Sequence, residues 1–258
     1  MSDTNAMISL VGLSKSYGKQ SAVEDLHLQV GRELFVFLGP NGAGKTTTIK
    51  LMTGLLRPDK GTILLDGVDV NRQPVEAKKR FGYAPETPAL YEKLTPVEFI
   101  DFIIAVHRLD YKAALIRRDQ LFEIFELDDH VGKLVEELSN GMKKKLSLIA
   151  ALIHQPPILF LDEPTTALDP KAARNLKDLL RGIVAKGGCV FMSTHILEVA
   201  EAMCDRVGII HKGRLIALGT VDELRRQFDA DGSLEDIFLR LTGEPYADKV
   251  EEFLQLNG

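Results

Sequence analysis

Hydrophobic and polar positions alternate along residues 7–38, and this period of two predicts strands rather than helices. We expect a small antiparallel sheet here that leads into an apolar strand over residues 34–38. A hairpin is predicted over Thr62–Val70, because Asp66-Gly67 at its centre is a favoured two-residue turn. A further short strand, which a proline stops, is predicted over Phe81–Glu86.

The period becomes helical between residues 87 and 154. Thr95, followed by Pro96 and by Glu98 three residues after the cap, is typical of a helix N-terminus with a capping box. Apolar positions at helical spacing continue through residues 97–107, 115–127 and 139–153. Residues 87–154 are therefore predicted to form an all-helical insert.

Beyond the insert, strands and helices alternate. The predicted strands are residues 158–161 and 189–194, the predicted helices are residues 171–184 and 196–203, and a hairpin is predicted over residues 207–217. This alternation indicates a mostly parallel sheet covered by helices on both faces. The expected fold class is therefore α/β, with a mostly parallel core sheet, an antiparallel β subdomain and an inserted all-helical subdomain.

Composition narrows the class of protein. The 258 residues are 45% apolar and 27% charged, as in an ordinary globular protein. Cys189 and Cys204 lack the spacing of a metal site and are expected to be reduced thiols in a cytosolic protein. The first residues lack a secretory-signal pattern, and the most apolar helix candidate, Val97–Leu109, is too short and too charged to span a bilayer. A net charge of −5 gives no general electrostatic footprint for nucleic acid.

Residues Gly39–Thr46 have the pattern G-x-x-x-x-G-K-[ST] and stand between an apolar strand and a helical segment. This order suits a phosphate cradle, because the N–H groups of the loop and of the helix N-terminus attract phosphate oxygens. Lys45 is expected to neutralise the β and γ oxygens, and the Thr46 hydroxyl to hold Mg²⁺. A glycine-rich turn that matches by chance is disfavoured by the flanking strand and helix. The nucleotide-binding candidates here are Gly39, Asn41, Gly42, Gly44, Lys45, Thr46 and Thr47.

Two carboxylates, Asp162 and Glu163, stand at the end of an apolar strand. Ligands of α/β sheets bind beyond the carboxyl ends of strands, so we expect Asp162 to face Thr46 and complete the magnesium shell. Glu163 is expected to orient or deprotonate the attacking water. The alternative role, an N-cap acid for the next helix, fits Asp169 better, since Pro170 follows it.

These motifs, in this order, resemble the nucleotide-binding subunit of an ATP-binding cassette (ABC) transporter, over about residues 7–225. The resemblance implies an ATPase with a P-loop NTPase core that uses ATP and Mg²⁺. Tyr17 lies 28 residues before Lys45 and matches the aromatic that stacks on adenine. The alternative for Tyr17 is a hairpin aromatic on the sheet surface.

Leu138-Ser-Asn-Gly-Met142 occupies the place of the family's Leu-Ser-Gly-Gly-Gln signature and departs from it at Asn140 and Met142. Ser139 and the Gly141 backbone would open a second helix N-terminus able to hold phosphate oxygens. The resemblance implies that they serve the ATP held by the other protomer. Lys143–Lys145, which follows, is expected to be a solvated helix face.

Three further positions resemble family motifs. Ala167–Asp169 resembles the loop that links the two active sites of the dimer. His195 ends a predicted strand and matches the family's switch histidine, which contacts the γ-phosphate. Glu86 stands where most members carry glutamine, and we place it among the metal-site candidates with Thr46 and Asp162. Glutamate here is familiar from export-type members.

The resulting expectation is an ATPase domain over residues 1–225 and a C-terminal helical extension over residues 226–258. Within the extension, Ser233–Gly243 is an amphipathic helix that resembles the ABC-2 exporters and is expected to pack on the core, with Leu234, Ile237, Phe238 and Leu241 as its apolar positions. We expect a homodimer that sandwiches two ATP molecules on the cytoplasmic face of a membrane and powers export through separate permease subunits. The alternatives are a soluble cassette ATPase acting on nucleic acid or ribosomes, and a regulatory module without turnover.

Overall fold

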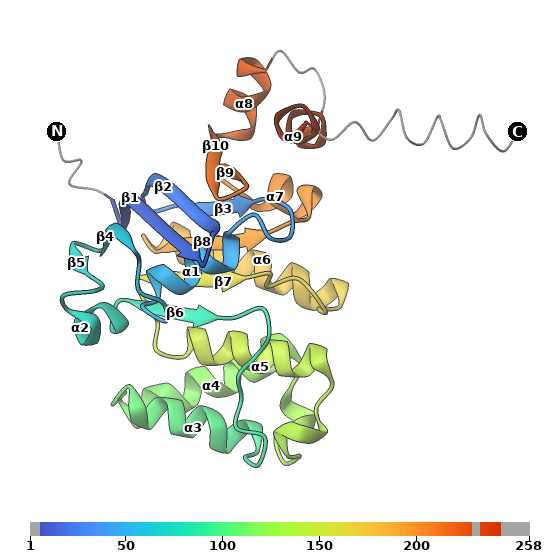
Figure 1. The fold of residues 1–258 in the computed structure, drawn as a ribbon. Coiled ribbons are helices and arrows are strands. Elements are labelled where there is room, and N and C mark those ends of the chain that lie inside the picture. The colour runs from blue at the N-terminus through green and yellow to red at the C-terminus, as the bar shows by residue number, and fades with distance from the viewer. Residues whose placement is uncertain (1–5, 229–232, 244–258) are drawn as a thin grey trace, which may run out of the picture.

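Two β-sheets organise the chain, and the computed structural model describes them within residues 6–228 and 233–243 (Figure 1). The first sheet is antiparallel with strand order β2-β1-β4-β5. Its strands are β1 (Ile8–Tyr17), β2 (Gln20–Val30), β4 (Lys60–Leu65) and β5 (Val68–Asp69). The predicted N-terminal sheet and the hairpin at Asp66-Gly67 are both confirmed. They form one sheet because β1 also pairs with β4, where Ile8 lies opposite Leu65.

The second sheet has the order β10-β9-β3-β8-β7-β6. Its strands are β3 (Leu34–Leu38), β6 (Phe81–Ala84), β7 (Ile158–Asp162), β8 (Cys189–Thr194), β9 (Arg206–His211) and β10 (Arg214–Gly219). Every neighbouring pair is parallel except β9 and β10, which form the predicted hairpin. The carboxyl ends of β3, β7 and β8 therefore meet at one edge of the sheet.

Among the described residues, the α-helices follow the predicted order, with two additions. They are α1 (Lys45–Met52), α2 (Pro74–Lys78), α3 (Pro96–Val106), α4 (Tyr111–Phe125), α5 (Asn140–Leu152), α6 (Pro170–Ala185), α7 (Leu197–Met203), α8 (Val221–Gln227) and α9 (Leu234–Thr242). The predicted capping box of α3 is present, since Glu98 N donates to Thr95 Oγ1 and Thr95 N donates to Glu98 Oε2. The short helices α2 and α8 were not predicted, although Thr220 and Glu223 form the capping box that begins α8.

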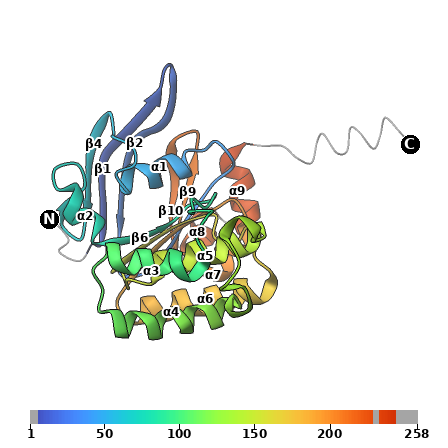
Figure 2. The same cartoon turned by 90° about the horizontal axis from the view of Figure 1, so that it is seen from below.

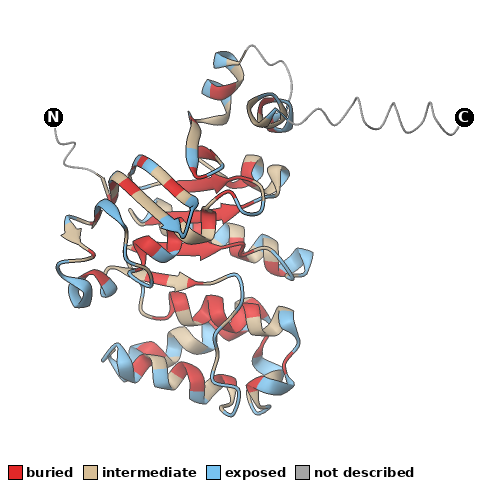
Figure 3. Ribbon diagram, viewed as in Figure 1, coloured by how far each residue is buried: buried red, intermediate tan, exposed pale blue. Residues whose placement is uncertain are grey.

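The core lies on both faces of the second sheet. Leu34 and Val36 belong to the cluster that the helices from α3 to α7 complete, whereas Phe35 and Phe37 belong to the cluster with α1 and the antiparallel sheet. Figure 2 shows α1 and the antiparallel sheet on the side of the second sheet opposite α4 and α6, and Figure 3 shows the central strands in the red of buried residues. The Phe35 and Phe191 rings lie 5.4 Å apart in this second cluster. Burial on both faces explains why the central strands are continuous apolar runs.

The predicted helix at residues 233–243 packs on the core as α9, where Leu234 and Ile237 are fully buried. Residues 244–258 of the predicted C-terminal extension lie outside the described residues. Among the residues that the structure describes, no helix has the length and apolar character needed to cross a membrane.

Candidate functional site

The loop from Gly39 to Gly44 joins β3 to α1 and requires glycine at both of its ends. Gly44 has φ of +109°, and a Cβ there would lie 2.3 Å from the carbonyl oxygen of Ala22 in β2. A Cβ at Gly39 would lie 2.4 Å from the carbonyl oxygen of Ile210 in β9. The loop is therefore held closely between the two sheets, and α1 begins directly after it at Lys45.

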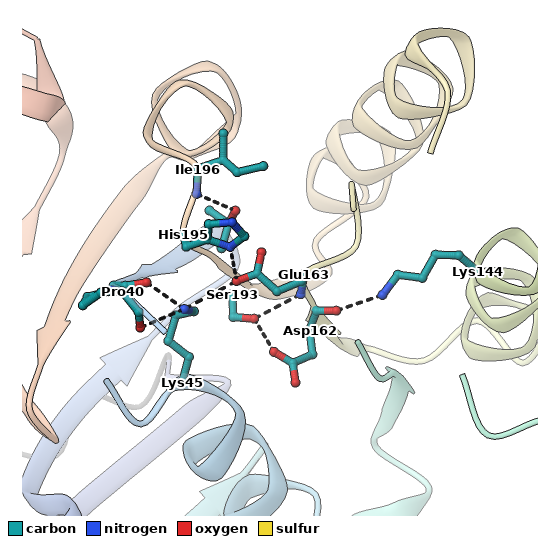
Figure 4. Close-up of polar contacts among 10 residues, drawn as sticks. Pro40, Lys45, Lys144, Asp162, Glu163, Ser193, His195 and Ile196 are labelled. Atoms are coloured by element: carbon teal, nitrogen blue, oxygen red, sulfur yellow. Dashed lines mark hydrogen bonds and ion pairs between the residues drawn. The ribbon is translucent and has the colours of Figure 1, made fainter. Parts of the chain in front are cut away.

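Lys45 is buried and points back over this loop (Figure 4). Its Nζ donates to the carbonyl oxygen of Gly39 at 2.7 Å and to that of Pro40 at 3.2 Å. The same Nζ lies 3.4 Å from Glu163 Oε1. The predicted phosphate-binding lysine and the predicted water-activating glutamate are thus brought together.

Glu163 follows β7 in a left-handed backbone conformation, with φ of +46°. This conformation costs a residue other than glycine on the order of 1–3 kcal/mol, and such strain gathers at functional sites. The side chain is 5% exposed, and its Oε1 lies 3.0 Å from Nδ1 of His195. Glu163 and His195, which the sequence indicated separately, are therefore in direct contact at the ends of β7 and β8.

Ser193, which the sequence analysis did not select, connects the two acidic residues. Its Oγ donates to Asp162 Oδ1 at 2.5 Å and accepts from the backbone N–H of Glu163 at 3.2 Å. Asp162 Oδ2 is buried and has no hydrogen-bond partner among the described residues. A carboxylate oxygen left free in this way suits Mg²⁺, which binds oxygen ligands.

The remaining candidates of the nucleotide site lie around this centre. Asn41 and Gly42 are exposed on the loop, whereas Thr46 and Thr47 are half-buried in the first turn of α1. Tyr17 ends β1 with 52% of its surface exposed. The β1–β2 hairpin lies beside the loop, as the contact between Ala22 and Gly44 requires.

Glu86 has an exposed side chain just beyond β6. Within residues 6–228 and 233–243, no three His, Cys, Asp or Glu residues are grouped as metal ligands. The structure therefore does not gather Glu86 with Asp162 and Glu163, and its role at the metal stays a prediction.

Ser139 and Gly141 lie apart from these residues, at the start of α5. Ser139 is the N-cap, and its Oγ accepts from Met142 N at 3.3 Å. A Cβ at Gly141 would lie 2.7 Å from the carbonyl oxygen of Ala167, so the signature packs against the loop at residues 167–169. No hydrogen bond or ion pair within the described part of the chain joins Ser139 or Gly141 to Lys45, Glu163 or His195.

The expectation that Lys143–Lys145 forms a solvated face is wrong. Lys144 is 2% exposed and Lys145 is 8% exposed. Lys145 Nζ lies 2.8 Å from Asp169 Oδ2, and this contact lowers the pKa of Asp169. Asp169 is also the N-cap of α6, as predicted, since its Oδ1 accepts from Ala172 N at 2.8 Å. The ammonium groups of Lys144 and Lys145 can be buried because neighbouring elements supply hydrogen-bond acceptors for them.

Comparison with known proteins agrees with this arrangement. The family model described as "ABC transporter" matches residues 23–166, which is more than half of the chain. The chain belongs to the ABC transporter family. The solved "Structure of ATP binding subunit of ABC transporter" superposes with a TM-score of 0.87 at 36% identity, covering 92% of this chain and 99% of that one. The predicted fold class is thereby confirmed.

Two relatives within the ABC family show which of its members this chain is similar to. It is 40% identical to the daunorubicin resistance ATP-binding protein DrrA3 of Streptomyces coeruleorubidus, covering 95% of this chain and 76% of DrrA3. It is 37% identical to the probable multidrug ABC transporter ATP-binding protein YbhF of Escherichia coli (strain K12). That match covers 89% of this chain but only 40% of YbhF.

As a member of this ABC family, the chain is an ATP-binding ATPase subunit of a transporter. The relatives and the solved structure reported above are named for transport, resistance or ATP binding. The alternative of an ATPase acting on nucleic acid or ribosomes finds no support in them.

Proposed function

We propose that two copies of this chain bind head to tail around two ATP molecules, and that hydrolysis drives export through separate permease subunits. The observation that carries this proposal is the separation of two half-sites in one chain. Lys45, Glu163 and His195 form one contiguous group, whereas Ser139 and Gly141 share no polar contact with it among the described residues. A second copy in head-to-tail orientation would bring the start of its α5 to the group formed by the first copy.

The residues divide the work on ATP between them. The loop Gly39–Thr47 would bind the phosphates, and the adenine would stack on Tyr17. Lys45 would exchange the carbonyls of Gly39 and Pro40 for phosphate oxygens. Glu163 would accept the proton of the attacking water, and His195, which contacts the Glu163 carboxylate, would hold the γ-phosphate.

Thr46 and the unpaired oxygen of Asp162 would hold Mg²⁺. When bound, this ion would neutralise the charge that develops on the β and γ oxygens. Glu86 would lie beside the metal in the nucleotide-bound dimer. The Ser139 hydroxyl and the N–H of Gly141 would bind the phosphate of the ATP held by the opposite copy.

An exposed apolar patch supports a membrane partner. The patch consists of Tyr91, Phe102 and Val106, which are 58%, 42% and 58% exposed. The Tyr91 and Phe102 rings contact edge to face with centroids 5.4 Å apart, and Val106 lies one helical turn beyond Phe102 on α3. A patch of this kind suits an apolar helix of a permease on the cytoplasmic face of the membrane. Export as the direction rests on the name of the resistance relative DrrA3.

The proposal is tested by affinity recovery of a tagged full-length Glu163→Gln chain from detergent-solubilised membranes of the source organism. We expect a multi-span membrane protein in stoichiometric amount, identified by mass spectrometry. Tyr91→Glu should lose this partner while keeping its thermal unfolding midpoint. The matched control is Leu55→Glu, an exposed apolar residue outside the patch, which should keep the partner. Recovery of ribosomes or nucleic-acid proteins without a membrane protein would refute the proposal.

A further inference from the structure

Lys144 is the most deeply buried lysine among the described residues, and its ammonium group makes three hydrogen bonds, of which Figure 4 shows the one to Asp162. Its Nζ donates to the carbonyl oxygens of Pro85 at 3.0 Å, Glu86 at 3.1 Å and Asp162 at 3.0 Å. An ammonium group has three N–H donors, so these three acceptors saturate it.

The three carbonyls lie where pairing between two strands stops. The ladder between β6 and β7 ends with Ala84 opposite Leu161. The residue that follows β6 is Pro85, which has no N–H and cannot extend the ladder. The Lys144 ammonium supplies donors at this point and joins the two strand ends to α5.

Each of these attachments adjoins a part of the proposed ATP site. Asp162 is the proposed magnesium ligand and precedes Glu163, and Glu86 is the proposed neighbour of the metal. On the other side of the contact, α5 begins at the N-cap Ser139, five residues before Lys144. One buried side chain therefore connects the helix that would receive the opposite ATP to the residues that would hydrolyse the chain's own ATP.

A role in packing alone does not account for a charged group here. Burial takes the Lys144 ammonium out of water, which costs free energy for a charged group. An apolar side chain of similar volume would avoid that cost. Burying the ammonium is therefore unfavourable for packing alone, but it fixes the positions of three backbone carbonyl oxygens at the ends of two strands.

We propose that Lys144 is a positioning residue, which sets the backbone of Glu86 and Asp162 relative to α5 so that hydrolysis depends on the placement of the signature helix. Lys144 touches neither ATP nor the water and acts through the residues that do. The inference rests on the proposed function, in which α5 of one copy binds the ATP of the other.

The test compares Lys144→Met, which removes all donors, with Lys144→Gln, which keeps an amide N–H₂ group. The matched control is Lys143→Met, because Lys143 is the adjacent, partly exposed lysine and lies 3.8 Å from Glu92. Steady-state ATP hydrolysis and calorimetric ATP affinity are measured on the full-length chain, well below its unfolding temperature.

We expect Lys144→Met to reduce kcat by about 10–100-fold, the range for a misplaced catalytic group. KM and the ATP dissociation constant should change less than about twofold, because binding groups are untouched. Lys144→Gln should recover part of the kcat, and Lys143→Met should equal the wild type.

Wild-type kcat in a folded Lys144→Met chain would overturn the inference, as would an equal loss of ATP affinity. If Lys144→Met does not fold, Lys144→Gln decides by the same criteria, and failure of both to fold would assign Lys144 to stability alone. The Glu163→Gln variant distinguishes a failure of the proposed function from a failure of the inference about Lys144. If Glu163→Gln hydrolyses ATP normally, the proposed chemistry is wrong; if it is inactive while Lys144→Met is normal, only the inference about Lys144 is wrong.

Discussion

The ends of β7 and β8 and the start of α5 are both polar, but only the first forms a connected site. At the strand ends, Ser193 bonds both Asp162 and Glu163, and Glu163 in turn contacts His195 and Lys45. At the start of α5, the Ser139 side chain caps its own helix. The first region gathers a lysine, two carboxylates and a histidine at one point, whereas Ser139 and Gly141 share no polar contact with that group among the described residues.

The difference follows from how each region is positioned. Parallel pairing brings the carboxyl ends of neighbouring strands to one edge, so residues distant in sequence meet there without further support. The start of α5 is reached through the helical insert and is held by side chains, namely Lys144 on three carbonyls and Lys145 on Asp169. The connected region is thus part of the second sheet, whereas the start of α5 is attached to that sheet through side chains.

The largest effect is expected from breaking the connected region at Glu163. Glu163→Gln keeps the shape of the side chain but removes the base, so kcat should fall by about 10²–10⁴-fold, the range for a positioned general base. ATP affinity, measured by calorimetry, should remain that of the wild type. Glu198→Gln, an exposed glutamate on α7, is the control and should leave the rate unchanged. A Glu163→Gln chain with normal hydrolysis would remove Glu163 from this role.

The next largest effect on the hydrolysis rate is expected from a substitution at the start of α5. Aspartate is as good an N-cap as serine, so Ser139→Asp should preserve the helix while placing a negative charge against the phosphate of the opposite ATP. We expect the hydrolysis rate to fall by about 10²-fold, because like charges at a binding contact cost several kcal/mol. Ser139→Asn is the control, because asparagine is a neutral N-cap of the same size as aspartate. Its hydrolysis rate should fall far less.

Mixing two inactive variants tests whether the two regions meet across a dimer. Lys45→Ala should be inactive because it cannot bind the phosphates. An equal mixture of Lys45→Ala and Ser139→Asp chains should recover about a quarter of the wild-type rate, because half of the dimers are mixed and each mixed dimer has one intact composite site. A mixture that stays as inactive as its components would show that the two regions do not meet across a dimer.

The sequence predicted those features that are specified locally. The phosphate loop was predictable because its glycines, Lys45 and the flanking strand and helix are contiguous, and Asp162 and Glu163 were predictable as acids ending an apolar strand. The burial of Lys144 was not, because three consecutive lysines resemble a solvated face. What buries Lys144 is the end of the β6–β7 ladder, which is determined by strands far away in sequence.

Ser193 was missed for a related reason, and it gives the smallest of the expected effects on the rate. A serine near the end of a strand matches no motif, yet this one is fully buried and fixes both Asp162 and Glu163. Ser193→Ala removes a hydrogen bond to a carboxylate, a contact that contributes about 1.5–3 kcal/mol. We therefore expect a fall in kcat of about tenfold and a higher Mg²⁺ concentration for half-maximal activity, since Asp162 is no longer held in place.

Ser147→Ala provides the control for Ser193→Ala, because Ser147 is a buried serine on α5 that makes no hydrogen bond to Asp162 or Glu163 among the described residues. Its rate and Mg²⁺ dependence should match the wild type. If Ser193→Ala lowers the unfolding temperature but leaves kcat and the Mg²⁺ dependence unchanged, Ser193 supports the sheet and does not orient the site. If the Mg²⁺ dependence shifts while ATP affinity without metal is kept, the connected region at the strand ends holds the cation through Asp162, and its connection through Ser193 is what distinguishes it from the start of α5.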